Sequence, residues 1–200
     1  MPVAGVIPAD DPQAAATGSD RSARIKRNVI EWGVIIAVAV IAALLLRAFV
    51  VQPYFIPSDS MYPTLKDGDK VLVNKVSYHM HPIHRGDVVV FKTPPNDHSP
   101  GIKDLIKRVI GLPGETIQSG PNGEILINGN PIKQPWLTAS AKAGPGPPVP
   151  KMTLTAGEYF VMGDNRGDSS DSRVFGPISR SLIVGRAFVI VWPVSRIGGL

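Results

Sequence analysis

The chain contains one long apolar run followed by a series of short ones. Residues 29–51 hold only two charges, Glu31 and Arg47, and both lie near the ends of the run. A helix of this length, at about 1.5 Å per residue, crosses the roughly 30 Å hydrocarbon core of a bilayer. A buried core helix is the alternative, but the run lacks the polar face that such a helix usually keeps. No pair of small residues follows it, which argues against a cleaved signal sequence. The pattern therefore predicts a transmembrane anchor at 29–51.

After residue 51 the apolar segments become short, rich in β-branched residues, and separated by turn sequences such as "LPGE" and "GPNGE". This alternation is typical of antiparallel strands joined by tight turns. We expect strands at 70–76, 87–92, 104–112, 124–129, 158–164 and 185–192, and no capped helix. The sequence thus predicts a mainly β protein: one N-terminal transmembrane helix, then an antiparallel all-β domain over 52–200 with a small inserted β region at about 118–157.

The distribution of charge near the N-terminus predicts the orientation of the anchor. The chain has 21 basic and 16 acidic residues, a net charge of +5. Four of the basic residues cluster at 21–27, directly before the apolar run, and such clusters stay on the cytoplasmic side of a membrane. We therefore expect 1–28 to be a cytoplasmic, disordered tail and 52–200 to lie outside a single-pass plasma-membrane anchor. Membrane lipid, and not nucleic acid, is the partner that this charge predicts.

The composition also limits the chemistry of any site. The chain has no cysteine, so zinc-thiolate sites, disulfides and thiol catalysis are excluded. Three histidines in "YHMHPIHRGD" could bind a metal, but no carboxylate pattern accompanies them. The aspartates of 163–176 do not have the spacing of an EF-hand loop. We expect no metal and no cofactor.

Two serines stand in an unusual context in "FIPSDSMYPTLKDGD", residues 55–69. A surface turn uses serine and proline in this way but rarely includes Ile56 and Met61. A serine nucleophile needs a base, and none of the histidines is well placed to be one. A lysine can take this role only if burial removes its proton.

The segment "DLIKRVIGL", 104–112, places two cations in an apolar strand. Lys107 shares one face with Leu105 and Val109, and Arg108 lies on the other face. Periodicity does not say which face is inside, and a solvated lysine remains the alternative. Because a guanidinium does not deprotonate, only Lys107 could serve as a base.

Five segments together resemble the signature boxes of bacterial type I signal peptidases, in the family's order and after its membrane anchor. They are "RAFVVQPYFIPSDSMYPTL", "GDKVLVNK", "RGDVVVFK", "DLIKRVIGLPGE" and "GDNRGDSSDSRVFG". The resemblance covers most of the chain, from Arg47 to Trp192. One span and a short inserted region look more like the enzymes of Gram-positive bacteria than the two-span form.

The resemblance implies a membrane-anchored serine endopeptidase that removes signal peptides from exported preproteins through an acyl-enzyme. It implies that Ser60 is the nucleophile and Lys107 the general base. The Ser58 hydroxyl and the Ser60 backbone N–H would stabilise the oxyanion. The substrates would carry small residues before the cleavage site.

The resemblance further implies that Ser169 orients the lysine and that Asp171 and Arg173 form a supporting ion pair. At 167–168 this chain has glycine and aspartate where many members carry aspartate and asparagine. Shallow pockets for small side chains would be formed by Tyr54, Ile56, Pro57, Leu105 and Ile106.

Two alternatives to this interpretation are a penicillin-binding acylase and a non-catalytic membrane-anchored domain. Penicillin-binding Ser/Lys acylases need lysine three residues after the serine, and Pro63 stands there. A non-catalytic anchored β-domain that binds export partners stays open, although a degenerate copy would be expected to lose Ser60 or Lys107.

Overall fold

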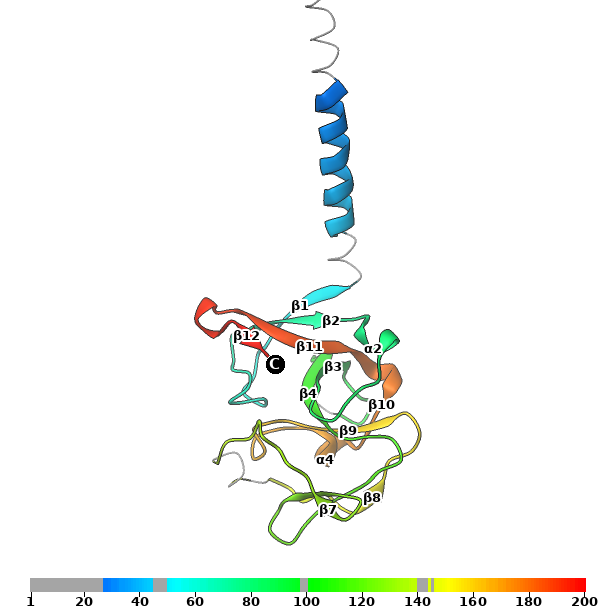
Figure 1. The fold of residues 1–200 in the computed structure, drawn as a ribbon. Coiled ribbons are helices and arrows are strands. Elements are labelled where there is room, and N and C mark those ends of the chain that lie inside the picture. Colours follow the sequence, from blue (N-terminus) through cyan, green and yellow to red (C-terminus); the bar gives the residue numbers. More distant parts are fainter. Residues whose placement is uncertain (1–26, 45–49, 98–100, 140–143, 145) are drawn as a thin grey trace, which may run out of the picture. The chain divides into compact units, whose positions relative to one another are not determined.

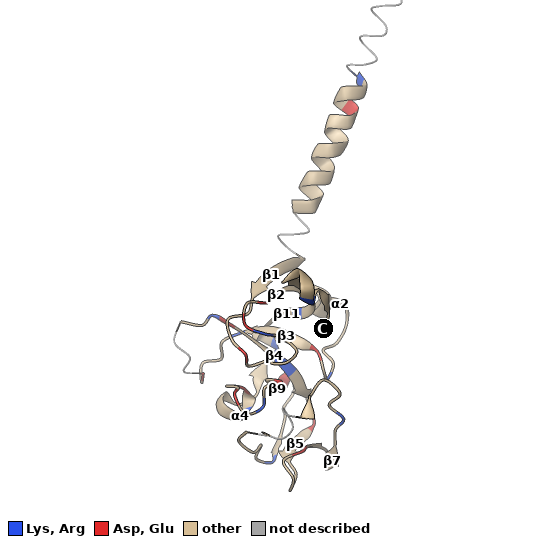
Figure 2. Cartoon of the chain, turned by 90° about the vertical axis from the view of Figure 1, so that its left-hand side faces the viewer, with Lys and Arg blue, Asp and Glu red and all other residues tan. Residues whose placement is uncertain are grey.

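The computed structural model describes residues 27–44, 50–97, 101–139, 144 and 146–200. The chain divides into two compact units, Met1–Leu46 and Arg47–Leu200. The first contains a helix, Arg27–Leu44, that is long and apolar enough to cross a membrane, and its side chains are exposed. Charges on it occur only near its N-terminal end (Figure 2). Residues 1–26 of the predicted tail and residues 45–49 of the predicted anchor lie outside the described residues.

The second unit is built on a large antiparallel sheet (Figure 1). Its strands follow the order β1-β2-β11-β3-β4-β9-β10, and β12 pairs with β11. They are β1 (Val51–Phe55), β2 (Lys70–Asn74), β3 (Val88–Lys92), β4 (Asp104–Gly111), β9 (Glu158–Met162), β10 (Ile178–Ser179), β11 (Ile183–Trp192) and β12 (Gly198–Gly199).

Both faces of the sheet are buried at β3, which explains why this strand reads as an unbroken apolar run up to Lys92. In β3, Val88 and Val90 pack into a first core cluster, whereas Val89 and Phe91 pack into a second. The first cluster comprises Ile56, Met61, Leu65, Val71, Val73, Val88, Val90, Ile106, Ala187 and Ile190. The second comprises Ile83, Val89, Phe91, Val109, Val161, Phe175, Ile178 and Ile183. A strand buried on both faces loses the polar alternation of a half-exposed one.

A small sheet is inserted between β4 and β9. It has the order β7-β6-β5-β8 and consists of β5 (Thr116–Ser119), β6 (Ile125–Ile127), β7 (Asn130–Pro131) and β8 (Met152–Thr153). A third core cluster joins its isoleucines to Ile110 of β4 and to Phe160 and Met162 of β9. The inserted region therefore packs on the ends of the two strands between which it is inserted.

The antiparallel β domain is confirmed, and each of the six predicted strands has a counterpart. The shortest elements were not predicted, because two to five residues carry too little periodicity. They include α2 (Ser77–Met80), α4 (Ser172–Phe175) and the 3₁₀ turns η1 (Arg180–Leu182) and η2 (Val194–Arg196). The expectation of no capped helix is wrong for α4, because the Asp171 side chain caps its first turn. Val51, the last residue of the predicted anchor, pairs with Asn74 and begins β1.

Candidate active site

The loop between β1 and β2 presents the two serines from a fixed base. Ile56, Met61 and Leu65 are at most 2% exposed and belong to the first core cluster. The Ile56 N–H donates to the Asp69 carbonyl at 2.9 Å, which closes the base of the loop. Ser58 is exposed and Ser60 half-buried. The apolar residues that seemed out of place in a turn therefore hold the loop on the core.

Lys107 meets this loop from β4, 47 positions further along the chain. Its side chain is buried, with 3% of the residue exposed, and its Nζ donates to Ser60 Oγ at 2.7 Å. The solvated-lysine alternative therefore does not hold. Both Lys107 and Arg108 are buried because β4 is covered on both faces, which is why periodicity alone could not choose between them.

Burial also changes the basicity of this amine. Desolvation lowers the pKa of Lys107 to about 8, while Asp171, Asp97 and Asp164 act in the opposite direction. A low-dielectric environment disfavours the ammonium form. An appreciable fraction of Lys107 is therefore neutral near pH 8, in hydrogen-bonding reach of a serine hydroxyl.

Ser58 lies beside the same hydroxyl. Its Oγ is 3.4 Å from Ser60 Oγ, a long contact between two hydroxyls. An exposed hydroxyl has rotational freedom, so it can turn towards a charge that develops next to Ser60. The position agrees with the donor role that the resemblance implies.

The loop after β9 holds the backbone of the serine loop through hydrogen bonds to its carbonyl groups. The Asn165 N–H donates to the Ser60 carbonyl at 3.1 Å, and its side chain donates to the Asp59 carbonyl at 3.1 Å. Asp171 is fully buried, accepts from the Gly163 N–H at 3.0 Å, and forms the predicted ion pair with Arg173 at 2.7 Å. This ion pair thus fixes the loop that holds the nucleophile.

Ser169 differs from its predicted role. Its Oγ is buried and has no hydrogen-bond partner within the described part of the chain, so the predicted bond to Lys107 is not formed here. The hydroxyl packs against Gly163, where a side chain would collide with it and with the Ser60 carbonyl. Lys107 makes its hydrogen bond to Ser60 instead.

A buried network that sequence reasoning missed lies next to Lys107. The Arg108 guanidinium donates to Asp164 at 2.7 and 2.9 Å and to the Gly86 carbonyl at 2.7 Å. Thr64, four residues after Ser60, donates to Asp164 at 2.5 Å. One signal was present in the sequence, because Arg108 stands within the apolar part of one strand and Asp164 follows the apolar residues of another. Buried charges of this kind are normally paired.

The predicted pocket residues do not all lie together. Tyr54, Ile56 and Ile106 meet in the first core cluster, and Pro57 is exposed beside them. Leu105 packs against the second cluster, on the opposite face of the sheet. Neighbouring residues of a strand point to opposite faces, so Leu105 and Ile106 cannot both face Ile56.

The two strands that lead to Ser60 and Lys107 each have an unpaired edge. Of the described strands, only β2 pairs with β1. On β4, β9 pairs from Arg108 onward, so residues 104–107 are paired on one side only, with β3. The edges of β1 and β4 can therefore accept the backbone of another chain.

Among the described residues no three histidine, aspartate or glutamate side chains are grouped so that they could hold a metal ion. His81 and His84 stack with ring centroids 6.4 Å apart, next to α2. Asp164 and Asp171, which were considered for calcium, are bonded to arginines. The described site brings together a side-chain amine and two hydroxyls.

Comparison with known proteins identifies the family that the chain resembles. The family described as "Signal peptidase, peptidase S26" matches residues 29–192. A Signal peptidase I from Leptolyngbya laminosa is 42% identical over 168 residues, which are 82% of this chain and 80% of that protein. A Probable signal peptidase I-1 from Synechocystis sp. is 41% identical over 179 residues, 88% of this chain and 87% of its own. The crystal structure of a signal peptidase I from Enterococcus faecalis V583 is 32% identical and covers 53% of this chain and 97% of its own, with a TM-score of 0.45.

The match includes the apolar helix, the serine loop and the lysine strand, and it extends over most of the chain and of its relatives. On this evidence the chain belongs to the signal peptidase family, peptidase S26.

Proposed function

We propose that Ser60 is the nucleophile and Lys107 the general base with which this serine endopeptidase cleaves signal peptides from preproteins. One observation carries the proposal: a buried amine with a lowered pKa donates to a serine hydroxyl at 2.7 Å. Nucleophile and base are recognised by such a contact. A non-catalytic scaffold would have no need to keep a lysine desolvated.

The chemistry follows from these positions. Neutral Lys107 takes the proton of Ser60 Oγ as that oxygen attacks the carbonyl carbon of the scissile bond. The oxyanion that forms is stabilised by the Ser58 hydroxyl and the Ser60 backbone N–H. The Lys107 ammonium then gives its proton to the departing amine, which leaves an ester on Ser60. Lys107 next takes a proton from water as the water oxygen attacks the ester carbon. When the bond to Ser60 Oγ then breaks, the Lys107 ammonium returns the proton to Oγ, which releases the product and restores the enzyme.

Substrate recognition would use the unpaired edges of β1 and β4. Each strand runs towards the reacting pair, since β1 ends five residues before Ser60 and the free part of β4 ends at Lys107. A preprotein that extends along these edges would gain backbone hydrogen bonds. Ile56 and Ile106 would leave room only for small side chains at alternate positions.

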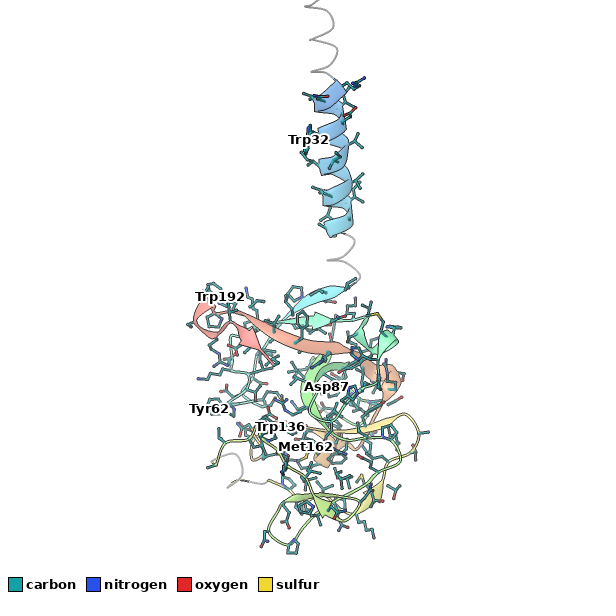
Figure 3. The ribbon with its side chains drawn as sticks, viewed as in Figure 1. Trp32, Tyr62, Asp87, Trp136, Met162 and Trp192 are labelled. Carbon is teal, nitrogen blue, oxygen red and sulfur yellow. The ribbon has the colours of Figure 1, made fainter. Side chains whose placement is uncertain are left out.

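The membrane is the other proposed partner. Phe55, Lys70 and Trp192 lie in one cross-strand row, and both aromatic side chains are more than half exposed. Figure 3 shows Trp192 at one end of the sheet. Aromatic and basic side chains favour the lipid interface. The basic residues before the helix would keep the N-terminus in the cytoplasm, with the catalytic domain outside.

The test is to react the full chain in detergent micelles with an acylating inhibitor and to locate the adduct by mass spectrometry. We expect it on Ser60, with no labelling after Lys107→Ala at the same folded fraction. An adduct elsewhere, or an inert Ser60 in folded protein, would favour the anchored scaffold.

A further inference from the structure

A cavity of about 760 Å³ lies between the inserted region and the loop after β9. Its walls come from the β5–β6 turn, the segment that follows β7, two prolines before β8, and Met162 and Arg166. In Figure 3, Trp136 and Met162 mark the part of the domain where this segment meets β9. The volume is in the range of ligand-binding pockets. Neither Ser60 nor Lys107 lines the cavity, so it is separate from the reacting pair.

Arg166 in its wall is a buried cation with neutral partners only. It is 5% exposed, its Nε donates to the Gly163 carbonyl at 3.0 Å, and its guanidinium donates to the Gln134 amide oxygen. Within the described ranges no carboxylate forms an ion pair with it. Burial lowers the pKa of Arg166 to about 10. Leaving a charge buried without a counterion costs several kcal/mol.

The carboxylates near Arg166 are already bonded elsewhere. Asp164 is held by Arg108, and Asp171 by Arg173. Glu124, the acidic residue in the cavity wall, accepts from the Asn122 N–H in its own turn. An exposed second cation, Lys133, also lines the cavity. The cavity is therefore suited to a ligand that brings its own negative charge.

We propose that this cavity binds a carboxylate-bearing segment of the preprotein downstream of the cleaved bond, with Arg166 and Lys133 as the cations that receive the carboxylate. This inference rests on the proposed function for the identity of the ligand. It adds a binding site for the part of the substrate that becomes the mature protein.

The position of the cavity favours the downstream segment. The free edges of β1 and β4 accommodate the chain before the cleaved bond. Beyond Lys107 the edge of β4 is occupied, because Met162 pairs with Arg108, so the substrate must leave the sheet there. Met162 and Arg166 both line the cavity. Asn165, between them, donates to the Ser60 carbonyl. The substrate segment after the cleaved bond would therefore meet the cavity within a few residues of Ser60.

The first test measures binding without turnover. The peptides correspond to the first residues of a mature protein. In one series a single glutamate is placed at each position in turn, and in the matched series glutamine takes its place. They are titrated against the Ser60→Ala full chain in neutral detergent. At one position the glutamate peptide should bind about tenfold more tightly, as expected for a charge-assisted hydrogen bond.

The variants assign that preference to the cavity. Lys133→Glu should remove or reverse the preference for glutamate. The matched Lys92→Glu, on the exposed end of β3 and outside the cavity, should leave it unchanged. Equal affinity for both series at every position, or equal effects of the two variants, would overturn the inference. If Arg166→Lys folds, it tests the contribution of the buried cation. If Arg166→Lys does not fold, the result of Lys133→Glu alone decides the inference.

The second test attaches the same segments to a signal peptide and follows cleavage by the unmodified enzyme. We expect a lower KM for the glutamate substrate and a similar kcat. Cleavage without this preference would overturn the inference and leave the proposed function intact. Absence of cleavage in every substrate would count against the proposed function, while the binding titration still decides whether the cavity takes a carboxylate.

Discussion

Lys107 and Arg108 are adjacent on β4 and almost equally buried, 3% and 5% exposed, yet their surroundings differ. Arg108 has a carboxylate and a carbonyl within hydrogen-bonding distance, and Asp164 compensates its charge. Lys107 donates to one neutral hydroxyl, and burial lowers its pKa. Among the described residues, the same burial thus gives a paired cation at Arg108 and, at Lys107, an amine with no carboxylate in contact and a lowered pKa, as the proposed base requires.

The largest effect on activity should come from replacing Lys107 by arginine, the residue found at the neighbouring position 108. Lys107→Arg keeps a cation but removes the ability to lose a proton at any working pH. We expect at least a 10³-fold loss of kcat/KM, close to that of Lys107→Ala, because the nucleophile loses its base. A preprotein cleavage assay measures it, with circular dichroism to confirm folding. Activity within tenfold of the unmodified enzyme would exclude the proposed base.

Removing the carboxylate that pairs with Arg108 should lower the stability of the fold. Asp164→Asn leaves Arg108 buried without its counterion, and removal of one partner of a buried pair costs about 3–5 kcal/mol. The free energy of unfolding of the full chain in detergent, from urea titration, should fall by this amount. Arg108 also donates to Thr64 Oγ1 at 3.3 Å, and its guanidinium lies 4.8 Å from the Trp136 ring centroid. A change below about 1 kcal/mol would mean that these two contacts and the Gly86 carbonyl satisfy Arg108 without the carboxylate.

Ser58→Ala tests whether the exposed hydroxyl acts on the transition state. One donor to an oxyanion is typically worth about 10²-fold in kcat. We expect that loss in kcat with little change in KM, and no change in stability, because Ser58 is exposed. Ser58→Thr, which keeps the hydroxyl, is the matched control and should retain more activity. A loss confined to KM would assign Ser58 to substrate binding.

The pH dependence distinguishes a desolvated lysine from an ordinary one. The pKa of Lys107 is lowered to about 8, and the base acts in its neutral form, so kcat/KM should rise about tenfold per pH unit below 8 and level off above it. Asp97 raises this pKa. Asp97→Asn should therefore move the rising limb to lower pH. A limb centred near the usual lysine value would contradict the desolvation.

The smallest effect should come from an ion pair near the surface. Arg186 contacts Asp87 at 3.1 Å, but its side chain is 40% exposed. Exposed pairs are worth about 1 kcal/mol or less. Arg186→Gln should lower the free energy of unfolding by no more than this in the same urea titration. A loss as large as that of Asp164→Asn would show that burial does not set the difference between the two pairs.

The elements with a clear signal were predictable from the sequence, and the contacts between distant segments were not. The strand that carries Lys107 was evident from its β-branched residues, and the pairing of Ser60 with Lys107 followed from the resemblance. The separation of Leu105 from Ile106 follows from the alternation within one strand and could have been predicted. The Arg108–Asp164 pair and the contact of Asn165 with the Ser60 carbonyl depend on strand register. A shift of one residue exchanges the faces of a strand, and no local pattern specifies the register between β4 and β9.

The unpaired edge of β4 at 104–107 has a consequence for the timing of secretion. An edge strand can bind only a chain whose own amides and carbonyls are free, and a helix or a folded hairpin has none to offer. If substrates bind this edge as proposed, residues around the cleavage site have to be unwound when they arrive. Cleavage would then compete in time with the folding of the exported domain, and a preprotein that folds quickly up to its first residues would escape processing.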